Sequence, residues 1–372
     1  MRRRVLLVGG LAVAAGVLGA LVVVTGAVPI KASSGHWPVT RAFLKFSMKR
    51  SVATHAPAQL QIDLGDPALV SKGAGHYHTA CQPCHGSPDA AYFPRIAAAL
   101  TAPPPVLLET VGDWTPEELF YIVKHGIKFT GMPAWPSQVR DDEVRAMVAF
   151  LVKLPTLDRE GYRALAHGEA GPLAEVVAPP DTEATEPATR ALVASCARCH
   201  GADGGGRGVG AFPKLAGQRR EYLLNALEAY AAGTRHSGIM EPVAAGLDAE
   251  ARRALADHYS GLPRVARGGD RPPDPAAIAR GERIALHGIP ERGVPRCLDC
   301  HGPGGPERNP AYPVLAGQYA DYLALQLELF RTGHRGGSAF AHLMSHVAPR
   351  LRPEEMRDVA RYYESLPAVP PP

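Results

Sequence analysis

The chain has 372 residues, with 40 Lys and Arg against 36 Asp and Glu, and six cysteines. Residues 1–62 contain eight of the basic residues and none of the acidic ones, so the rest of the chain has a net charge of −4. The small positive excess therefore belongs to the N-terminus and does not indicate a nucleic-acid-binding protein. The length allows two or three domains.

An apolar, uncharged run over residues 5–30 follows three arginines at positions 2–4. A membrane-spanning helix needs about 20 apolar residues, whereas the apolar region of a signal peptide has about 7–15. The run therefore predicts a single N-terminal transmembrane anchor. The arginines would stay on the cytoplasmic side, which places the rest of the chain outside the cytoplasm. Thr25-Gly26-Ala27 is a small-residue cleavage site, so removal of the segment stays open.

Residues 37–55 predict a basic amphipathic helix that completes the N-terminal segment, residues 1–62. Its apolar residues fall on one helical stripe and its basic residues flank that stripe. Such a helix can lie on a membrane surface, pack on a partner's membrane subunit, or serve as a stalk. The stripe consists of Phe43, Leu44, Phe46, Met48 and Val52, flanked by Arg41, Lys45, Lys49 and Arg50.

Three copies of the motif Cys-x-x-Cys-His use all six cysteines. This spacing is typical of covalent attachment of c-type haem. The two thiols bond to the haem, and the adjacent histidine is the proximal ligand of the iron. The chain therefore predicts three covalent haem c groups. The attachment residues are Cys81, Cys84, Cys196, Cys199, Cys297 and Cys300, and the proximal iron ligands are His85, His200 and His301.

Simpler interpretations of the cysteine pairs are a zinc site, a redox dithiol or a disulfide framework. Zinc usually needs two such pairs close together, and here the pairs lie 115 and 101 residues apart. A dithiol does not require an adjacent histidine, and a disulfide framework would not place every cysteine in one pattern. Haem attachment accounts for all three copies.

The motif intervals divide the chain into three units. Units 2 and 3 match beyond the motif, because residues 212–218 (FPKLAGQ) correspond to residues 312–318 (YPVLAGQ). A segment rich in Gly, Pro, Ala and Glu at residues 168–187 predicts a semi-extended tether. We therefore expect units 2 and 3 to pack as a pair and unit 1 to be more independent. The expected boundaries are 63–156 for unit 1, 157–187 for the linker, 188–264 for unit 2 and 265–372 for unit 3.

Helix signals dominate each unit. Asp66-Pro67 and Asp274-Pro275 each place an N-cap before a first-turn proline. Thr115-Pro116-Glu117-Glu118 forms a capping box. Residues 141–153 and 353–364 repeat apolar side chains at helical spacing, whereas alternating strand patterns are nearly absent. The sequence predicts an all-α fold.

Each unit has one methionine well after its motif histidine: Met132, Met240 and Met344. Methionine is often flexible core filler, but the matched placement predicts that these residues are the sixth ligands of the irons. His342 and His346 compete with Met344, and His236 competes with Met240. We expect the remaining histidines to be surface or packing residues; these include His76, His78, His125, His258 and His287.

Residues 188–367 resemble the two-haem bacterial cytochromes of the c-four type, on the two haem motifs, the Pro-x-Leu-Ala-Gly-Gln segments and the paired methionines. Residues 66–155 resemble a class I cytochrome c domain of the kind found in oxidase and dehydrogenase subunits. The resemblance implies three tandem class I domains whose motif histidines and methionines are axial ligands. The stretch His287–Pro295 departs from unit 2, because it lengthens the approach to the third motif.

Together these features predict an electron carrier, not an enzyme, held at the bacterial inner membrane with its haem domains in the periplasm. Its partners would be the membrane and redox proteins, not nucleic acid: a quinol–cytochrome c reductase or dehydrogenase as donor and a terminal oxidase as acceptor. One alternative is a cytochrome subunit of a periplasmic dehydrogenase. Another is a haem enzyme, either a peroxidase or a sulfur-compound oxidoreductase.

Overall fold

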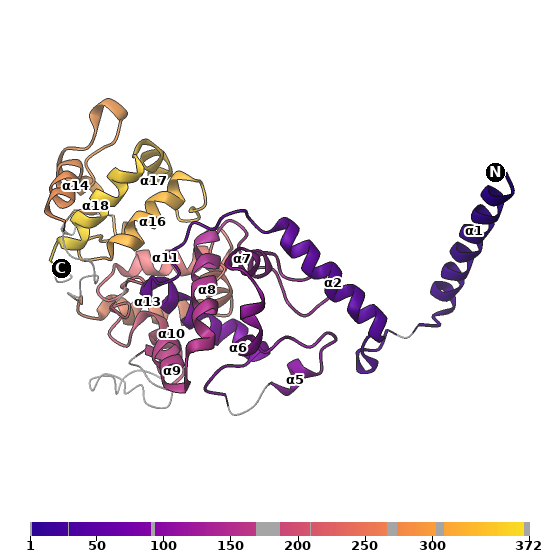
Figure 1. The fold of residues 1–372 in the computed structure, drawn as a ribbon. Coiled ribbons are helices and arrows are strands. Elements are labelled where there is room, and N and C mark those ends of the chain that lie inside the picture. The colour runs from indigo at the N-terminus through magenta and orange to yellow at the C-terminus, as the bar shows by residue number, and fades with distance from the viewer. Residues whose placement is uncertain are drawn as a thin grey trace.

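A computed structural model describes residues 2–28, 30–90, 94–168, 187–208, 210–265, 274–302 and 309–367. The regular structure in these ranges is helical. The β-pairing that they contain is one isolated antiparallel bridge between Ile289 and Val294. The all-α expectation is therefore confirmed. The helices gather in one body, from which the N-terminal helix stands apart (Figure 1).

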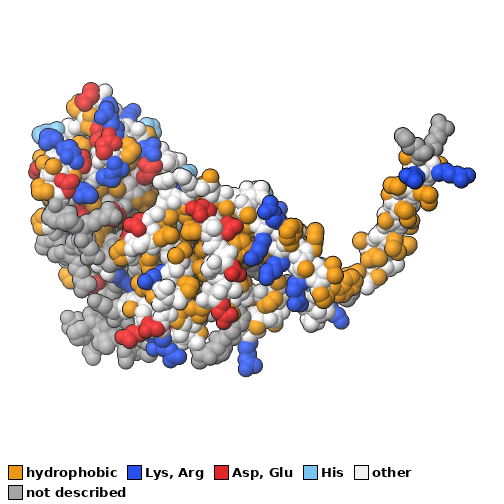
Figure 2. Space-filling model, viewed as in Figure 1, with side chains coloured by type: hydrophobic (Ala, Val, Ile, Leu, Met, Phe, Trp, Pro, Cys, Tyr) orange, Lys and Arg blue, Asp and Glu red, His pale blue; other side chains and the backbone are white. Residues whose placement is uncertain are grey.

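The N-terminal segment contains two long helices, α1 (Arg2–Thr25) and α2 (Pro38–His55), with a short 3-10 turn η1 (Ala32–Ser34) between them. The stretch Arg3–Thr25 is long and apolar enough to cross a membrane, and none of it is buried in the protein. Such a helix fits either an anchor or a signal sequence. Its surface is almost entirely apolar, with basic side chains at the N-terminal end (Figure 2).

Unit 1 is built around the crossing of its first long helix, α3, and its last, α8. Gly73 permits this contact, because a Cβ at that position would lie 2.3 Å from the Ala146 carbonyl oxygen. Tyr77, Phe150 and Tyr162 fill the core beside the crossing. The helices and turns of this unit are α3 (Pro67–His76), the π-helical turn η2 (Tyr77–Cys81), α4 (Gln82–His85), α5 (Arg95–Ala98), α6 (Leu107–Thr110), η3 (Val111–Asp113), α7 (Pro116–His125), α8 (Asp141–Lys153) and η4 (Leu154–Thr156).

Units 2 and 3 repeat one plan, in which the first and last helices of the unit pack together. In unit 3, Gly281 has the role of Gly73, because a Cβ there would lie 2.0 Å from the Asp358 carbonyl oxygen. The helices of unit 2 are α10 (Pro187–His200), α11 (Arg220–Ala231), α12 (Met240–Ala245) and α13 (Ala249–Gly261). Those of unit 3 are α14 (Pro275–His287), η7 (Pro290–Arg292), α15 (Leu298–His301), α16 (Ala320–Arg331), α17 (Ala341–Val347), η8 (Ala348–Arg350) and α18 (Pro353–Ser365).

Units 2 and 3 pack as the expected pair through two glutamines in corresponding positions. Gln218 donates to the Val314 carbonyl at 3.0 Å and accepts from the Val314 amide at 2.9 Å. Gln318 makes the same two bonds to Lys214, each at 3.0 Å. The two repeats are therefore joined by one contact made twice, in opposite senses.

The expectation that unit 1 is more independent is wrong. Residues 159–167, which the sequence placed in the linker, form α9 (Arg159–His167), because Asp158 caps the helix and Tyr162 enters the core of unit 1. From unit 2, Arg207 donates to the carbonyls of Ala164 and Leu165 at 3.0 and 2.9 Å. The remaining linker, residues 169–186, lies outside the described residues.

Candidate haem-binding sites

The cysteine motif lies on a helix or at its start in every unit. Cys81 ends the π-helical turn before α4, Cys196 and Cys199 lie within α10, and Cys297 caps α15. None of the six cysteines forms a disulfide in the structure, which argues against the disulfide interpretation. Within the described ranges, which include every cysteine, His, Cys, Asp and Glu form no group of three that would bind a metal such as zinc. The motifs thus remain available as separate attachment sites.

A hydrogen bond fixes the motif histidine in the same way in each unit. The Nδ1 atom lies within hydrogen-bonding distance of a proline carbonyl oxygen: 2.9 Å for His85, 3.1 Å for His200 and 3.0 Å for His301. A carbonyl oxygen only accepts, so Nδ1 carries the proton and Nε2 is left with its lone pair. A ligating histidine requires this tautomer. The three carbonyls belong to Pro105, Pro213 and Pro313.

Burial favours the uncharged form of several of the attachment groups. It raises the pKa of Cys81 to about 12 and that of Cys196 and Cys297 to about 11. It also lowers the pKa of His85 and His200, which favours the neutral imidazole. Each unit thus offers two free thiols and, in His85 and its counterparts, an imidazole with a fixed tautomer. This donor set fits a covalently bound haem, which supplies one-electron chemistry at its iron.

The three methionines lie in corresponding places, between the middle helix of each unit and its last helix. All are half-buried. Met132 lies in the loop between α7 and α8, where its amide donates to Thr130 Oγ1 at 3.1 Å. Met240 begins α12, and Met344 lies in α17 against a core cluster containing Phe330. The assignment of these methionines as sixth ligands stays a prediction.

Two of the competing histidines are more exposed than the methionine beside them. His342 and His346 are exposed, whereas Met344 is half-buried, and the Nδ1 atoms of these histidines lie 3.1 and 2.7 Å from backbone carbonyls of the same segment. His236 is half-buried like Met240, with a side chain 43% exposed that lies 3.6 Å from the Glu241 carboxylate. Solvent exposure therefore makes His342 and His346 poorer candidates for a buried ligand than Met344.

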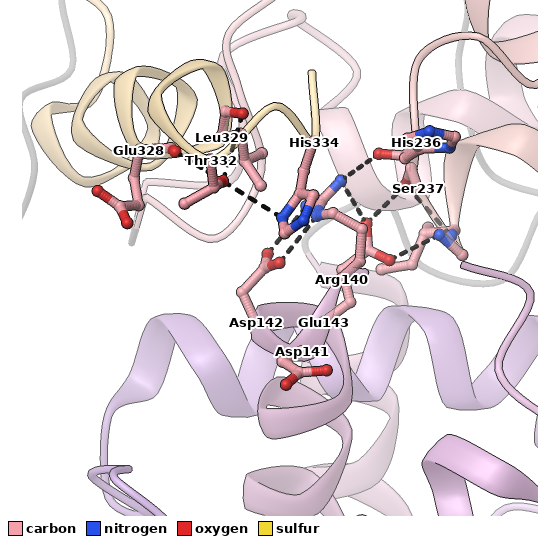
Figure 3. Close-up of polar contacts among 12 residues, drawn as sticks. Arg140, Asp141, Asp142, Glu143, His236, Ser237, Glu328, Leu329, Thr332 and His334 are labelled. Carbon is pink, nitrogen blue, oxygen red and sulfur yellow. Dashed lines mark hydrogen bonds and ion pairs between the residues drawn. The ribbon is translucent and has the colours of Figure 1, made fainter. Parts of the chain in front are cut away.

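A buried ionic cluster, which the sequence analysis missed, joins two of the methionine loops (Figure 3). Glu143, only 3% exposed, accepts from Ser237 Oγ at 2.6 Å and from the Gly238 amide at 2.7 Å. On the unit 1 side it pairs with Arg140 at 3.0 Å and accepts from Trp135 Nε1 at 3.2 Å. Burial raises the pKa of Glu143, and the Arg140 guanidinium opposes that shift.

The cluster holds both loops in place because its groups lie close to the methionines in sequence. Ser237 Oγ accepts from the Met240 amide at 2.9 Å, and Trp135 follows Met132 by three residues. Arg140 also donates to the His236 carbonyl at 2.6 Å. In the sequence, Glu143 is the last of three acidic residues that begin a helix. Acidic residues at a helix N-terminus are usually solvent-exposed, so this pattern did not predict a buried role.

The histidines expected to pack do so in unit 1. His76 lies against Trp135, with ring centroids 4.8 Å apart, and His78 Nδ1 lies 3.0 Å from the Tyr162 hydroxyl. Burial lowers the pKa of His76 and of His78 to about 4. Both rings are therefore neutral at physiological pH.

Parts of the chain are similar to known proteins. Residues 68–151 match the family model described as cytochrome c oxidase, cbb3-type, subunit III, and residues 188–258 match that of cytochrome c. A "thiosulfate dehydrogenase electron acceptor" of Thiomonas intermedia is 36% identical over 201 residues, covering 54% of this chain and 87% of that protein. Cytochrome c4 of Stutzerimonas stutzeri is 32% identical over 188 residues, covering 47% of this chain and 85% of that protein. A solved cytochrome c4 from Acidithiobacillus ferrooxidans is 33% identical, covering 46% of this chain and 98% of that one, with a TM-score of 0.41.

The chain therefore belongs to the c-type cytochromes, proteins that carry electrons on covalently bound haem. More narrowly, it joins a cytochrome c4-like, two-haem region to a domain like subunit III of the cbb3-type oxidases.

Proposed function

We propose that this protein is a membrane-tethered, three-haem electron carrier that takes electrons from a periplasmic dehydrogenase and passes them to a terminal oxidase. The observation that carries the proposal is the proline carbonyl bound to the motif histidine in each of the three units. In every unit this hydrogen bond leaves Nε2 of the motif histidine with its lone pair, so that it can bind an iron beside the two thiols of the motif.

The chain's own residues hold each haem and set its environment. The two thiols of each motif would attach the group, and the oriented imidazole would be one ligand of its iron. Met132, Met240 and Met344 would supply the sixth ligand in their respective units. Histidine with methionine gives a higher reduction potential than two histidines, which suits the oxidising end of a respiratory chain.

We infer the direction of flow from the relatives. The Thiomonas relative is named as an electron acceptor of thiosulfate dehydrogenase, and its match spans 201 residues, close to the combined length of units 2 and 3. Unit 1 instead matches an oxidase subunit. Units 2 and 3 would therefore receive electrons from a dehydrogenase that oxidises a sulfur compound, and unit 1 would deliver them to a haem–copper oxidase.

Anchoring by α1 would place α2 at the membrane surface. Twelve residues separate Thr25 from Pro38, so the start of α2 lies within about 45 Å of the end of the span even if the link is fully extended. Trp37, Val39, Phe43 and Phe46 are 65–81% exposed. Basic residues flank them, and tryptophan is typical of the membrane interface.

A reconstituted electron-transfer assay tests the proposed function. The holoprotein is mixed with a thiosulfate-oxidising dehydrogenase and thiosulfate, and its visible spectrum is followed; membranes containing a haem–copper oxidase are then added. We expect reduction that requires both dehydrogenase and thiosulfate, followed by reoxidation that requires the oxidase. Reduction by a quinol-oxidising complex alone would contradict the dehydrogenase assignment, and a failure to be reoxidised would contradict the oxidase assignment.

A further inference from the structure

The haem motif of unit 2 lies against the segment that leads into the haem motif of unit 1. Arg198, between the two cysteines of the second motif, donates from Nη2 to Thr79 Oγ1 at 2.7 Å. Thr79 precedes Cys81 by two residues. One hydrogen bond therefore connects the two attachment sites, although 119 residues separate its partners.

A glycine brings the backbone of unit 1 directly onto the second motif. A Cβ at Gly75, on α3, would lie 3.2 Å from Cys199 Sγ and 3.1 Å from the ring of Phe212. Phe212 in turn packs edge-on against the ring of His200, with centroids 6.1 Å apart. Gly75 therefore brings the backbone of α3 into contact with the Cys199 thiol and with the ring that packs on His200.

Two polar contacts hold this approach in place. On one side, Arg207 bonds the carbonyls of Ala164 and Leu165 on α9. On the other, the Glu143 carboxylate receives bonds from Ser237 and Gly238 of unit 2. Separating the units would leave the Glu143 charge without these two donors, which is costly for a buried ion. The contact between α3 and α10 is therefore a fixed feature of the fold.

We propose that the contact between α3 and α10 is the site at which electrons pass between unit 2 and unit 1. In each transfer one electron leaves unit 2, which is oxidised, and arrives at unit 1, which is reduced; no proton moves. Unit 2 meets unit 3 through a different surface, that of Gln218 and Gln318. Unit 2 thus contacts each of the other two units through a separate surface, and electrons that enter at unit 3 reach unit 1 through unit 2. This inference rests on the proposed function of an electron carrier with three haems.

The test separates the contact by substitution at its closest point. In Gly75→Val, the new side chain must push α3 away from Cys199 and Phe212. Gly112→Ala, in the same unit, is the matched control, because a Cβ there has nothing within 4 Å. Both are made in holoprotein that also carries Met132→His, since a second histidine lowers the potential of haem 1 and gives it a separate spectrum. A laser pulse with a flavin donor then places one electron on the protein.

The rate of redistribution and the hydrogen exchange of α3 and α10 are then compared. In the parent protein we expect a fast phase of electron transfer from unit 1 to unit 2. Gly75→Val should lose this phase and should raise amide hydrogen exchange on both helices, whereas Gly112→Ala should change neither. A Gly75→Val protein that opens the contact but keeps the fast phase would overturn the proposal. If that variant does not fold, Thr79→Val, which removes both the bond from Arg198 and the Thr79 bond to the Gly75 carbonyl, must slow the same phase. Fewer than three haems in the parent protein would instead contradict the proposed function.

Discussion

At the scale of single residues, the carboxylate of Glu143 is the least expected feature. It accepts hydrogen bonds from two residues of unit 2 and one of unit 1, and pairs with Arg140. A buried charge is tolerated only when its partners satisfy it, and here they come from both units. The position of the Met240 loop relative to unit 1 therefore depends on Glu143, together with the Arg140 bond to the His236 carbonyl.

Replacing Glu143 with glutamine tests that dependence. The amide keeps the shape but loses the charge, and its NH₂ group cannot accept from Ser237 or Gly238. We expect a loss of about 1–3 kcal/mol in the free energy of unfolding, measured by denaturant titration of the holoprotein. Glu109→Gln, at an exposed position of the same unit, is the control. Equal stability of the two variants would contradict this role of Glu143.

Acid sensitivity is a second prediction at this scale. Burial lowers the pKa of His76 to about 4, with Arg198 acting in the same direction. The unfolded chain takes up this proton near pH 6.5, before the folded protein does. The stability contributed by neutral His76 is therefore complete above about pH 6.5 and declines as the pH falls towards 4.

His76→Gln removes that titration. Between pH 7 and pH 4.5 we expect this variant to lose less stability than the parent, by on the order of 1 kcal/mol, in denaturant titrations at the two pH values. The exposed His36→Gln should lose as much as the parent does. If His76→Gln lost as much free energy of unfolding between pH 7 and pH 4.5 as the parent, this histidine would be excluded as a source of acid sensitivity.

At the scale of elements, the first and last helices of a unit meet through a glycine. Gly73 and Gly281 lie where a Cβ would come within 2.3 and 2.0 Å of a carbonyl oxygen on the facing helix. These distances are too short for any side chain, so the helices must separate to admit one. The haem motif follows the first helix, and the proposed methionine ligand precedes the last. The crossing therefore sets the spacing of the site.

Gly281→Ala should destabilise unit 3 by about 1–3 kcal/mol, the usual cost of overpacking, despite the better helix propensity of alanine. Gly261→Ala is the control, since it is also helical and has open space around it. Thermal unfolding followed by haem absorbance measures both. A melting temperature for Gly281→Ala at or above that of the control would show that the crossing is not tight.

The two ends of α2 differ in their packing. Its C-terminal part is fixed to unit 1, where Val52 is 2% exposed, His55 stacks on Tyr121, and Lys49 lies over Trp114. Its N-terminal part has no comparable contact among the described residues. The apolar side chains Val39, Phe43 and Phe46 are available there to a lipid surface.

Phe43→Ser with Phe46→Ser tests the lipid contact. In the full chain reconstituted into anionic lipid nanodiscs, we expect amides 38–47 to be protected from hydrogen exchange in the parent and to lose protection in the double variant. Protection of α1 should persist in both. Val243→Ser, at an exposed apolar position of unit 2, should change nothing. Protection that appears only with a membrane partner protein would assign this face to that partner.

At the scale of the whole molecule, the three units form one continuous body. Units 2 and 3 are joined by a symmetric contact: Arg235 donates to the Tyr322 hydroxyl at 3.3 Å and Arg335 to the Tyr222 hydroxyl at 3.0 Å. Unit 1 joins unit 2 through Arg198, Arg207 and the Glu143 cluster, which have no counterpart in that symmetry. Units 2 and 3 thus form a symmetric two-haem pair, and unit 1 packs against unit 2 of that pair.

The sequence predicted the features that depend on local signals. Caps such as Asp66 and Thr115 form as expected. The contacts of unit 1 with unit 2 were not predictable, because Arg140 meets the His236 carbonyl across 96 residues of sequence. Such a pair leaves no periodic pattern. The proline carbonyls that bind the motif histidines were not predictable either, because every residue has a backbone carbonyl and the sequence does not show which one lies near the histidine.

The most direct test of the central claim is the number and ligation of the haems in the purified holoprotein. Haem content per chain and near-infrared absorption of the oxidised protein measure these together. We predict three haems per chain, with a methionine–iron charge-transfer band whose intensity corresponds to three sites. Fewer than three haems, or a high-spin spectrum that shows an open iron, would contradict the account of a closed three-haem carrier.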